Sequence, residues 1–396
     1  MPDRWLPVGY LLFAHLCLLA AFLVAAVSPR SLGGFYYHPK LIAVVHLVTL
    51  GWLTSSILGA LYLILPMALR SPLPARPADR WGFWLFVVGT LGMVSHFWIA
   101  EPSGMVWSAL LVVAAIGRVG WRTLSALSRA PAPDEHRLPF FLAFANMLLA
   151  ALLGMAIGID KSIDILPGFT LHHVYAHAHL AVLGWVTFMV MGASYRLLPM
   201  MLPAAVPRGG DLTASAVTAE IGLLWLTTAL AAGSDWAGPA ALLYLAGLAL
   251  FLRRLLWMRS HPKPAPKQLV RPDFGVLHLT AALAYLIAAI AVGMALLWAP
   301  GAPHGALAMV YGVLGLVGFL SQMVAGVSVR LLPLFAWLRQ FAASGFVEIP
   351  PSPHAIVHRP LHRLAFWLWM VGPAILAFGL ARPDAAATRL GGLILA

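Results

Sequence analysis

The segment from His177 to Pro199 reads HAHLAVLGWVTFMVMGASYRLLP, an apolar run with two histidines at its start and Arg-Leu-Leu-Pro at its end. The same pattern occurs from His46 to Pro66 as HLVTLGWLTSSILGALYLILP, and a weaker copy without the histidine runs from Val313 to Pro333. Each copy begins about 133 residues after the previous one, and such a period indicates an internal repeat of about three units in 396 residues.

Small and aromatic residues recur at fixed offsets within the copies. Glycines at one such offset predict close packing between helices, because a missing side chain lets two backbones approach; they are Gly59, Gly192 and Gly326. Prolines near the end of each copy are predicted to end helices at the cytoplasmic interface; they are Pro66, Pro199 and Pro333. Arg196 and Arg330 are expected to anchor the helices there.

The composition is that of a membrane protein. Hydrophobic residues make up 61% of the chain and charged residues 10%, with a mean hydropathy of +0.89. A helix needs about 20 apolar residues to cross a bilayer, and a bundle of helices satisfies every backbone polar group in lipid. Spans are predicted near residues 6–28, 41–68, 82–100, 105–126, 139–158, 174–200, 212–232, 238–257, 274–298, 306–334 and 363–381.

The predicted fold is therefore an all-α polytopic bundle of about twelve transmembrane helices, arranged as three pseudo-repeats of four. Residues 1–396 form a single transmembrane domain with repeat units 1–130, 131–260 and 261–396. The last apolar stretch, 388–396, is too short to span and resembles a truncated twelfth helix. The first helices of the units align loosely, which places His15, Asn146 and His278 at one equivalent position.

The distribution of cations predicts a cytoplasmic N-terminus. The formal charge is +12, and with this orientation the predicted outer loops contain only five of the 25 Lys and Arg residues, namely Arg30, Lys40, Lys161, Arg382 and Arg389. Such asymmetry follows the positive-inside rule and is not a nucleic-acid signal. The bilayer is thus the expected partner. Cys17 is the only cysteine, which excludes an intrachain disulfide and a multi-thiolate metal site.

Histidines gather at the predicted outer ends of the helices. Neutral imidazole is a common ligand of metals and of haem iron, and ionisable groups inside a membrane usually pair or bind something. The candidate metal ligands are His46, His177, His179, His173, His172 and His96, and the candidate cofactor ligands are His46 and His179. The alternative is that these imidazoles reach the outer interface and bond water or lipid headgroups.

Glu220 is the clearest acidic residue inside a predicted span. Two interpretations stay open for it: a step in a proton relay, or a neutral carboxyl group that is hydrogen-bonded to a neighbouring helix.

The helix plan and the histidine motif resemble the catalytic subunit of the haem–copper oxidase superfamily. The segment that begins at His177 is similar to helix 2 of nitric-oxide reductases, which starts with a haem-ligating histidine and ends in Gly-Ala-x-Tyr-x-x-Pro. The resemblance implies that His46 matches the low-spin haem ligand of helix 2. It also implies that His179 matches the non-haem metal ligand of helix 6, with His177 as its neighbour.

The chain departs from that family at two places. Tyr311 and Val313 stand where the family has two haem-ligating histidines in helix 10, and the span 212–232 lacks the histidine pair of helix 7. The pair His172 and His173 is the candidate replacement. A proton-pumping oxygen reductase is therefore not expected. What the resemblance implies is a short stand-alone homologue that holds haem b, or a non-haem metal such as copper, iron or zinc.

The expected function is to bind or convert nitric oxide, dioxygen or an iron–nitrosyl species in the outer leaflet of a bacterial-type inner membrane. If the chain is an enzyme, the expected class is an oxidoreductase. The substrate would be a small gas or a metal complex, and broad Leu, Ala and Gly faces would allow a homo-oligomer. Two alternatives stay open. One is a transporter or assembly factor for metal or haem, and the other is a structural membrane subunit.

Overall fold

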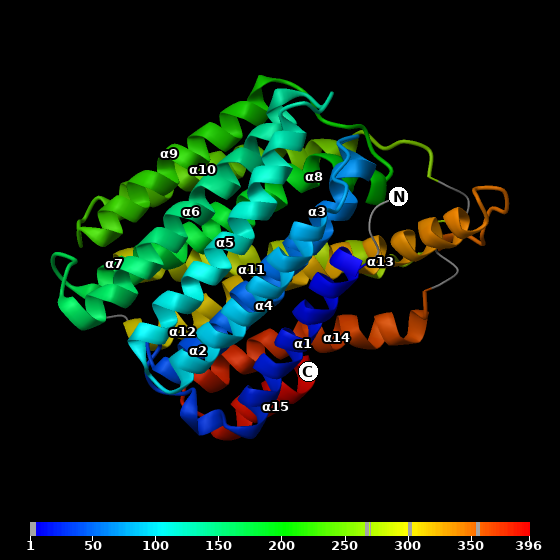
Figure 1. The fold of residues 1–396 in the computed structure, drawn as a ribbon. Helices are drawn as coiled ribbons and strands as arrows, with labels where there is room; N and C mark the ends of the chain where they lie inside the picture. Colours follow the sequence, from blue (N-terminus) through cyan, green and yellow to red (C-terminus); the bar gives the residue numbers. More distant parts are fainter. Residues whose placement is uncertain (1–4, 266–268, 270, 300–302, 354–356) are drawn as a thin grey trace. The chain divides into compact units, whose positions relative to one another are not determined.

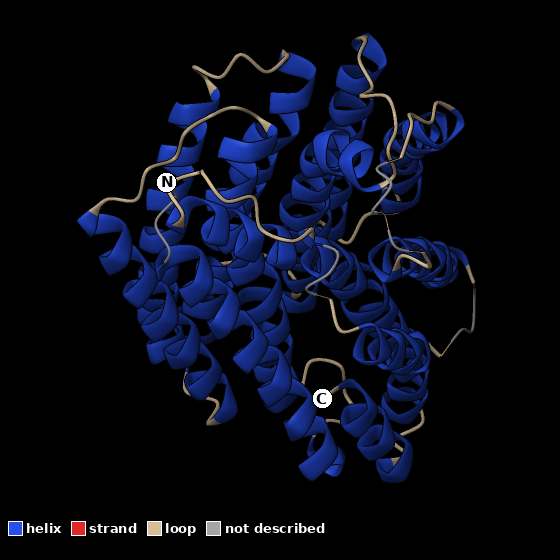
Figure 2. Cartoon of the chain, turned by 90° about the vertical axis from the view of Figure 1, so that its right-hand side faces the viewer, coloured by secondary structure: helices blue, strands red, loops and turns tan. Residues whose placement is uncertain are grey.

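The computed structural model describes residues 5–265, 269, 271–299, 303–353 and 357–396. Helices and their connections make up this part of the chain, which contains no β-strand beyond one isolated bridge between Ala204 and Pro262 (Figures 1 and 2). The α-helices are α1 (Trp5–Val27), α2 (Pro39–His46), α3 (Ser55–Ala68), α4 (Pro77–Trp98), α5 (Pro102–Leu127), α6 (Asp134–Ile163), α7 (Thr170–His179), α8 (Thr187–Met201), α9 (Gly210–Ala231), α10 (Ala237–Ser260), α11 (Phe274–Trp298), α12 (His304–Val313), α13 (Gln322–Ala343), α14 (Arg359–Ala381) and α15 (Ala385–Leu395).

Eleven helical spans of the described chain are long and apolar enough to cross a membrane, which confirms the predicted polytopic bundle. α15 is a further apolar helix of 11 residues. Large aromatic side chains stand on the outer faces of the helices, among them Trp81 and Trp121, which are 73% and 76% exposed. In a membrane such faces lie against lipid or at its interface.

The prediction that the repeated prolines end their helices is wrong for Pro333, whereas the helices around Pro66 and Pro199 end within two residues of the proline. α3 and α8 each continue two residues past the proline, to Ala68 and Met201, and α13 continues from Pro333 to Ala343. A proline removes one backbone hydrogen bond and crowds the turn before it. The N–H groups of the residues after Pro333 still donate to carbonyls four residues earlier, as in any α-helix, so α13 continues to Ala343.

The chain forms two compact units. The first comprises Met1–Leu18, Tyr37–Met200 and Ala204–Pro262, and the second comprises Leu19–Tyr36, Met201–Pro203 and Lys263–Ala396. The three repeat units remain a prediction from the sequence. The candidate histidines belong to the first unit.

Each copy of the repeated motif contains a π-helical segment at the same place. The segments are η2 (Leu47–Thr54), η3 (Leu180–Val186) and η4 (Leu314–Ser321), which begin directly after His46, His179 and Val313. In a π-helix each N–H bonds the carbonyl five residues earlier, which widens the turn. At the C-terminal edge of two segments a hydroxyl also bonds a carbonyl five residues earlier: Thr187 Oγ1 to Val182 O at 2.9 Å, and Ser321 Oγ to Leu316 O at 2.7 Å.

The repeated glycines lie at close helix contacts, as predicted. A Cβ atom on Gly192 would lie 2.7 Å from the Phe140 ring, and one on Gly326 would lie 2.8 Å from Gly275 O. A Cβ on Gly59 would lie 2.9 Å from Tyr10 Cβ. In each case the partner belongs to the first helix of the same predicted repeat unit.

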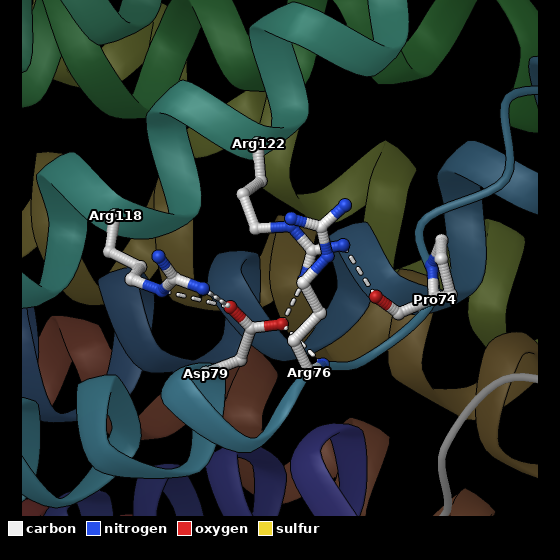
Figure 3. Close-up of polar contacts among 5 residues, drawn as sticks. All are labelled: Pro74, Arg76, Asp79, Arg118 and Arg122. Carbon is white, nitrogen blue, oxygen red and sulfur yellow. Dashed lines mark hydrogen bonds and ion pairs between the residues drawn. The ribbon is translucent and has the colours of Figure 1, made fainter.

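A buried carboxylate joins α4 to α5 (Figure 3). Asp79 is fully buried in the first turn of α4, where it accepts a hydrogen bond from the Arg76 N–H at 2.7 Å. It also pairs with Arg118, at 3.1 Å, and with Arg122 of α5. The second repeat has the same arrangement, since Asp211 in the first turn of α9 pairs with Arg253 and Arg254 near the end of α10.

Candidate histidine site

His46 is the last residue of α2 and directly precedes the π-helical segment η2. Its Nδ1–H donates to Ile42 O, one turn earlier, at 2.9 Å. The ring stacks on Phe97 of α4, with centroids 4.6 Å apart and an interplanar angle of 27°. Because Nδ1 carries the hydrogen, the lone pair of the neutral ring lies on Nε2, the atom that would ligate iron.

His179 has the same local arrangement in the second copy of the motif. It ends α7 before the π-helical segment η3, and its Nδ1–H donates to Tyr175 O at 2.7 Å. This hydrogen bond also places the lone pair of the neutral ring on Nε2. The two copies therefore prepare their histidines in the same tautomer.

His177 packs against α6. Its Nδ1–H donates to Ala150 O at 2.8 Å, and a Cβ on Gly154 would lie 2.8 Å from its ring. The two motif copies meet directly, because Trp185 Nε1–H donates to Thr54 Oγ1 at 3.0 Å. The first unit thus brings together the starts of two motif copies that are far apart in the sequence.

The other predicted ligands make different contacts. His173 is buried and donates from Nε2 to Pro167 O at 2.8 Å, which ties α7 to the preceding loop. His172 packs edge-to-face on Phe169 and lies against Gly233 of the α9–α10 turn. His96 lies 3.1 Å from Glu101 at the α4–α5 turn. These contacts are the kind that hold loops and turns.

No group of three or more His, Cys, Asp or Glu side chains is placed to hold a metal ion within the described chain, which includes all six candidate ligands. A site built from protein ligands alone commonly needs at least three. A haem iron receives four ligands from its porphyrin, so one or two imidazoles suffice. His46 and His179 each present one imidazole Nε2, which is what a single haem ligand requires.

Glu220 makes the hydrogen bond that one of its two interpretations requires. Asn146 Nδ2 of α6 donates to Glu220 Oε2 of α9 at 2.8 Å. His278 is the equivalent of Asn146 in the third repeat, and it bonds Gln322 Oε1 at 2.7 Å. His15 is the equivalent residue in the first repeat, and it donates to Leu11 O on its own helix. A proton relay through Glu220 stays a prediction.

The carboxylate of Glu101 lies beside His96 and caps the N-terminus of α5, so we expect the stability of this helix end to depend on pH. The Ser103 hydroxyl donates to Glu101, and so do the Ser103 and Gly104 N–H groups at 3.2 and 2.7 Å. These bonds, with a smaller effect of His96, hold the pKa of Glu101 below its ordinary value of 4.5. The stabilisation of the α5 N-terminus is therefore present above pH 4.5 and lost as the pH falls through the lowered pKa.

Hydrogen exchange at Ser103 and Gly104 would measure this loss, after correction for intrinsic rates. Protection should fall in acid in the wild type, and Glu101→Gln should show lower protection with no such acid step. An acid step that persists in the variant would assign it to another group.

Sequence reasoning missed two features of this region. The π-helical segments were not expected, although a Thr or Ser recurs eight residues after His46, His179 and Val313, as Thr54, Thr187 and Ser321. The Asp79 pairing was also missed. The signal for it was an acid early in one apolar helix and two arginines, one turn apart, late in the next.

No protein-family model matches the sequence, and no curated protein matches it.

Proposed function

We propose that this chain is an integral-membrane haem-binding protein, related to the haem–copper oxidases, that binds or converts nitric oxide, dioxygen or an iron–nitrosyl species. The proposal places the haem in the outer leaflet of a bacterial inner membrane and includes His46 and His179 as its candidate ligands. The observation that carries it is the orientation of His46, whose Nδ1–H is committed to Ile42 O, so that Nε2 has the lone pair.

Two further observations support the proposal. A histidine with this tautomer precedes a π-helical segment twice, and π-bulges are frequent at functional sites. The two motif copies also meet directly, since Trp185 Nε1–H donates to Thr54 Oγ1 at 3.0 Å. A haem held by one of these imidazoles would supply an iron that can bind a small gas. His46 would ligate the iron, with His179 as the alternative ligand, and the Nδ1–H bonds to Ile42 O and Tyr175 O hold the two rings in orientation.

The test is a visible absorption spectrum and an iron analysis of the full-length protein purified in mild detergent. We expect a Soret band in the wild type that is lost in His46→Ala. His15→Ala is a matched control, because His15 also donates from Nδ1 to its own helix, at 2.7 Å from Leu11 O, but precedes no π-helical segment. It should keep the band.

Other outcomes separate the alternatives. A band that survives in His46→Ala and disappears in His179→Ala would move the ligand to the second copy. Wild-type protein that contains neither haem nor iron would contradict the proposal. Weakly held, exchangeable metal, with loss of metal uptake on mutation of these histidines, would favour a transporter or assembly factor.

A further inference from the structure

One side of α10 is a continuous stripe of exposed residues. Its members follow one another at steps of three and four residues, so they share one face of the helix; they are Leu242, Ala246, Ala249, Arg253, Leu256 and Ser260. The first three are apolar, and Leu242 is 51% exposed. In a membrane such a face lies against acyl chains. Arg253 marks the point at which this exposed stripe changes from apolar to charged.

Arg253 belongs to an ion-pair group with more positive than negative charge. Asp211 pairs closely with Arg254, and each of these side chains is 21% exposed. Arg254 also lies against Trp257, with its Cζ 5.6 Å from the ring centre. Arg253 is 3.4 Å from the same carboxylate and 64% exposed. One carboxylate balances one guanidinium charge, so the more exposed Arg253 presents the remaining charge on the exposed stripe.

A second exposed cation lies near the end of the helix. Arg259 forms no ion pair in the part of the chain that the structure describes. Leu256 is three residues from each of the two exposed arginines, a spacing that makes neighbours on a helix surface, and it is 67% exposed. Residues 250–262 contain three arginines and no acidic residue. The end of α10 thus combines exposed apolar surface with positive charge.

Specific contacts hold this helix end in place. The ring of His261 stacks on that of Trp257, with centroids 4.2 Å apart and an interplanar angle of 24°. The His261 Nδ1–H donates to Trp257 O at 2.9 Å, which closes the last turn. The Ala205 N–H donates to His261 O at 2.9 Å, so the connection before α9 is tied to the end of α10. The two exposed arginines therefore stand on a fixed support.

We propose that the exposed stripe of α10 binds an anionic phospholipid, with its acyl chains along the apolar half and its phosphate at Arg253 and Arg259. Guanidinium groups donate strong, charge-assisted hydrogen bonds to phosphate oxygens. A free phosphate compound would contact the arginines alone, whereas a lipid also covers Leu256 and Ala249. The sequence predicts this helix end to be cytoplasmic, and the cytoplasmic leaflet is the negatively charged one.

Native mass spectrometry of the full-length protein in mild detergent tests this site. The protein is incubated with equal amounts of phosphatidylglycerol and phosphatidylcholine, and we expect the wild type to retain phosphatidylglycerol in preference. Loss of one arginine charge at the membrane surface should lower this retention about fivefold. The variants are Arg253→Gln and Arg259→Gln. The close pair of Asp211 with Arg254 is unchanged in both, so each variant keeps the contacts between α9 and α10.

Arg129→Gln is the control, because it removes one exposed arginine charge elsewhere in the first unit. It should retain phosphatidylglycerol as the wild type does. Equal retention by the wild type and both α10 variants would overturn the proposal. Displacement of phosphatidylglycerol by an equal concentration of inorganic phosphate would also overturn it, because the arginines would then recognise phosphate without the lipid.

Discussion

Replacing Asp79 by alanine is expected to lower the free energy of unfolding by about 3 kcal/mol or more, because it leaves buried arginine charge without a partner. Asp79 is completely buried, Arg122 is 9% exposed, and Arg118 is 35% exposed. The same change removes the acceptor of the Arg76 N–H, which caps α4. The loss therefore combines an ion pair with a helix cap, and Figure 3 shows both on one carboxylate.

Asp211→Ala is the matched control for this prediction. Asp211 has the same place in the second repeat, but its side chain and that of Arg254 are each 21% exposed, so water screens the pair. A loss of about 1 kcal/mol is expected there. Unfolding of the purified variants by denaturing detergent would measure both values. Equal losses would contradict the argument that burial decides the difference.

Replacing Gly222 by alanine is expected to lower the free energy of unfolding by about 1–3 kcal/mol, because it forces α9 away from α10. A Cβ on Gly222 would lie 2.3 Å from Tyr244 N and 2.6 Å from Tyr244 Cα. Both atoms belong to the backbone of α10, so no side-chain rotation relieves the clash. Gly247 of α10 makes the reciprocal approach to Ala219 N, at 2.3 Å.

Gly117→Ala is the control with the opposite expected sign. Gly117 lies inside α5, and a Cβ there would meet nothing within 4 Å. Removing the flexibility of a helical glycine should stabilise the protein by about 0.5–1 kcal/mol. Thermal unfolding in detergent compares the two variants directly. A melting temperature that rises in both would show that α9 and α10 can separate without cost.

The repeated glycines show which part of a helix contact can be predicted from the sequence. A residue without a side chain that recurs in three copies, as Gly59, Gly192 and Gly326 do, predicts a close helix contact, and each was found at one. The partner of each contact was not predictable, since it depends on which helix packs there. The prolines show the opposite case, because the helix around Pro333 tolerates its missing bond.

The histidines divide in the same way. Their presence at the starts of two motif copies, before the repeated Gly-Trp, was visible in the sequence. The sequence did not show which imidazoles already form hydrogen bonds to other groups, because the residue type does not reveal a hydrogen bond to a backbone carbonyl. His173 bonds Pro167 O and His96 approaches Glu101, whereas His46 bonds only its own helix through Nδ1.

The sequence by itself determined the all-helical class, the eleven spans and the repeat, because the free energy of burying an apolar segment in lipid depends mainly on the composition of that segment. The tertiary structure alone decided the π-helical segments and the pairing of Asp79 with two arginines of the next helix. These features depend on which residues meet across separate helices, and close packing selects those contacts one by one.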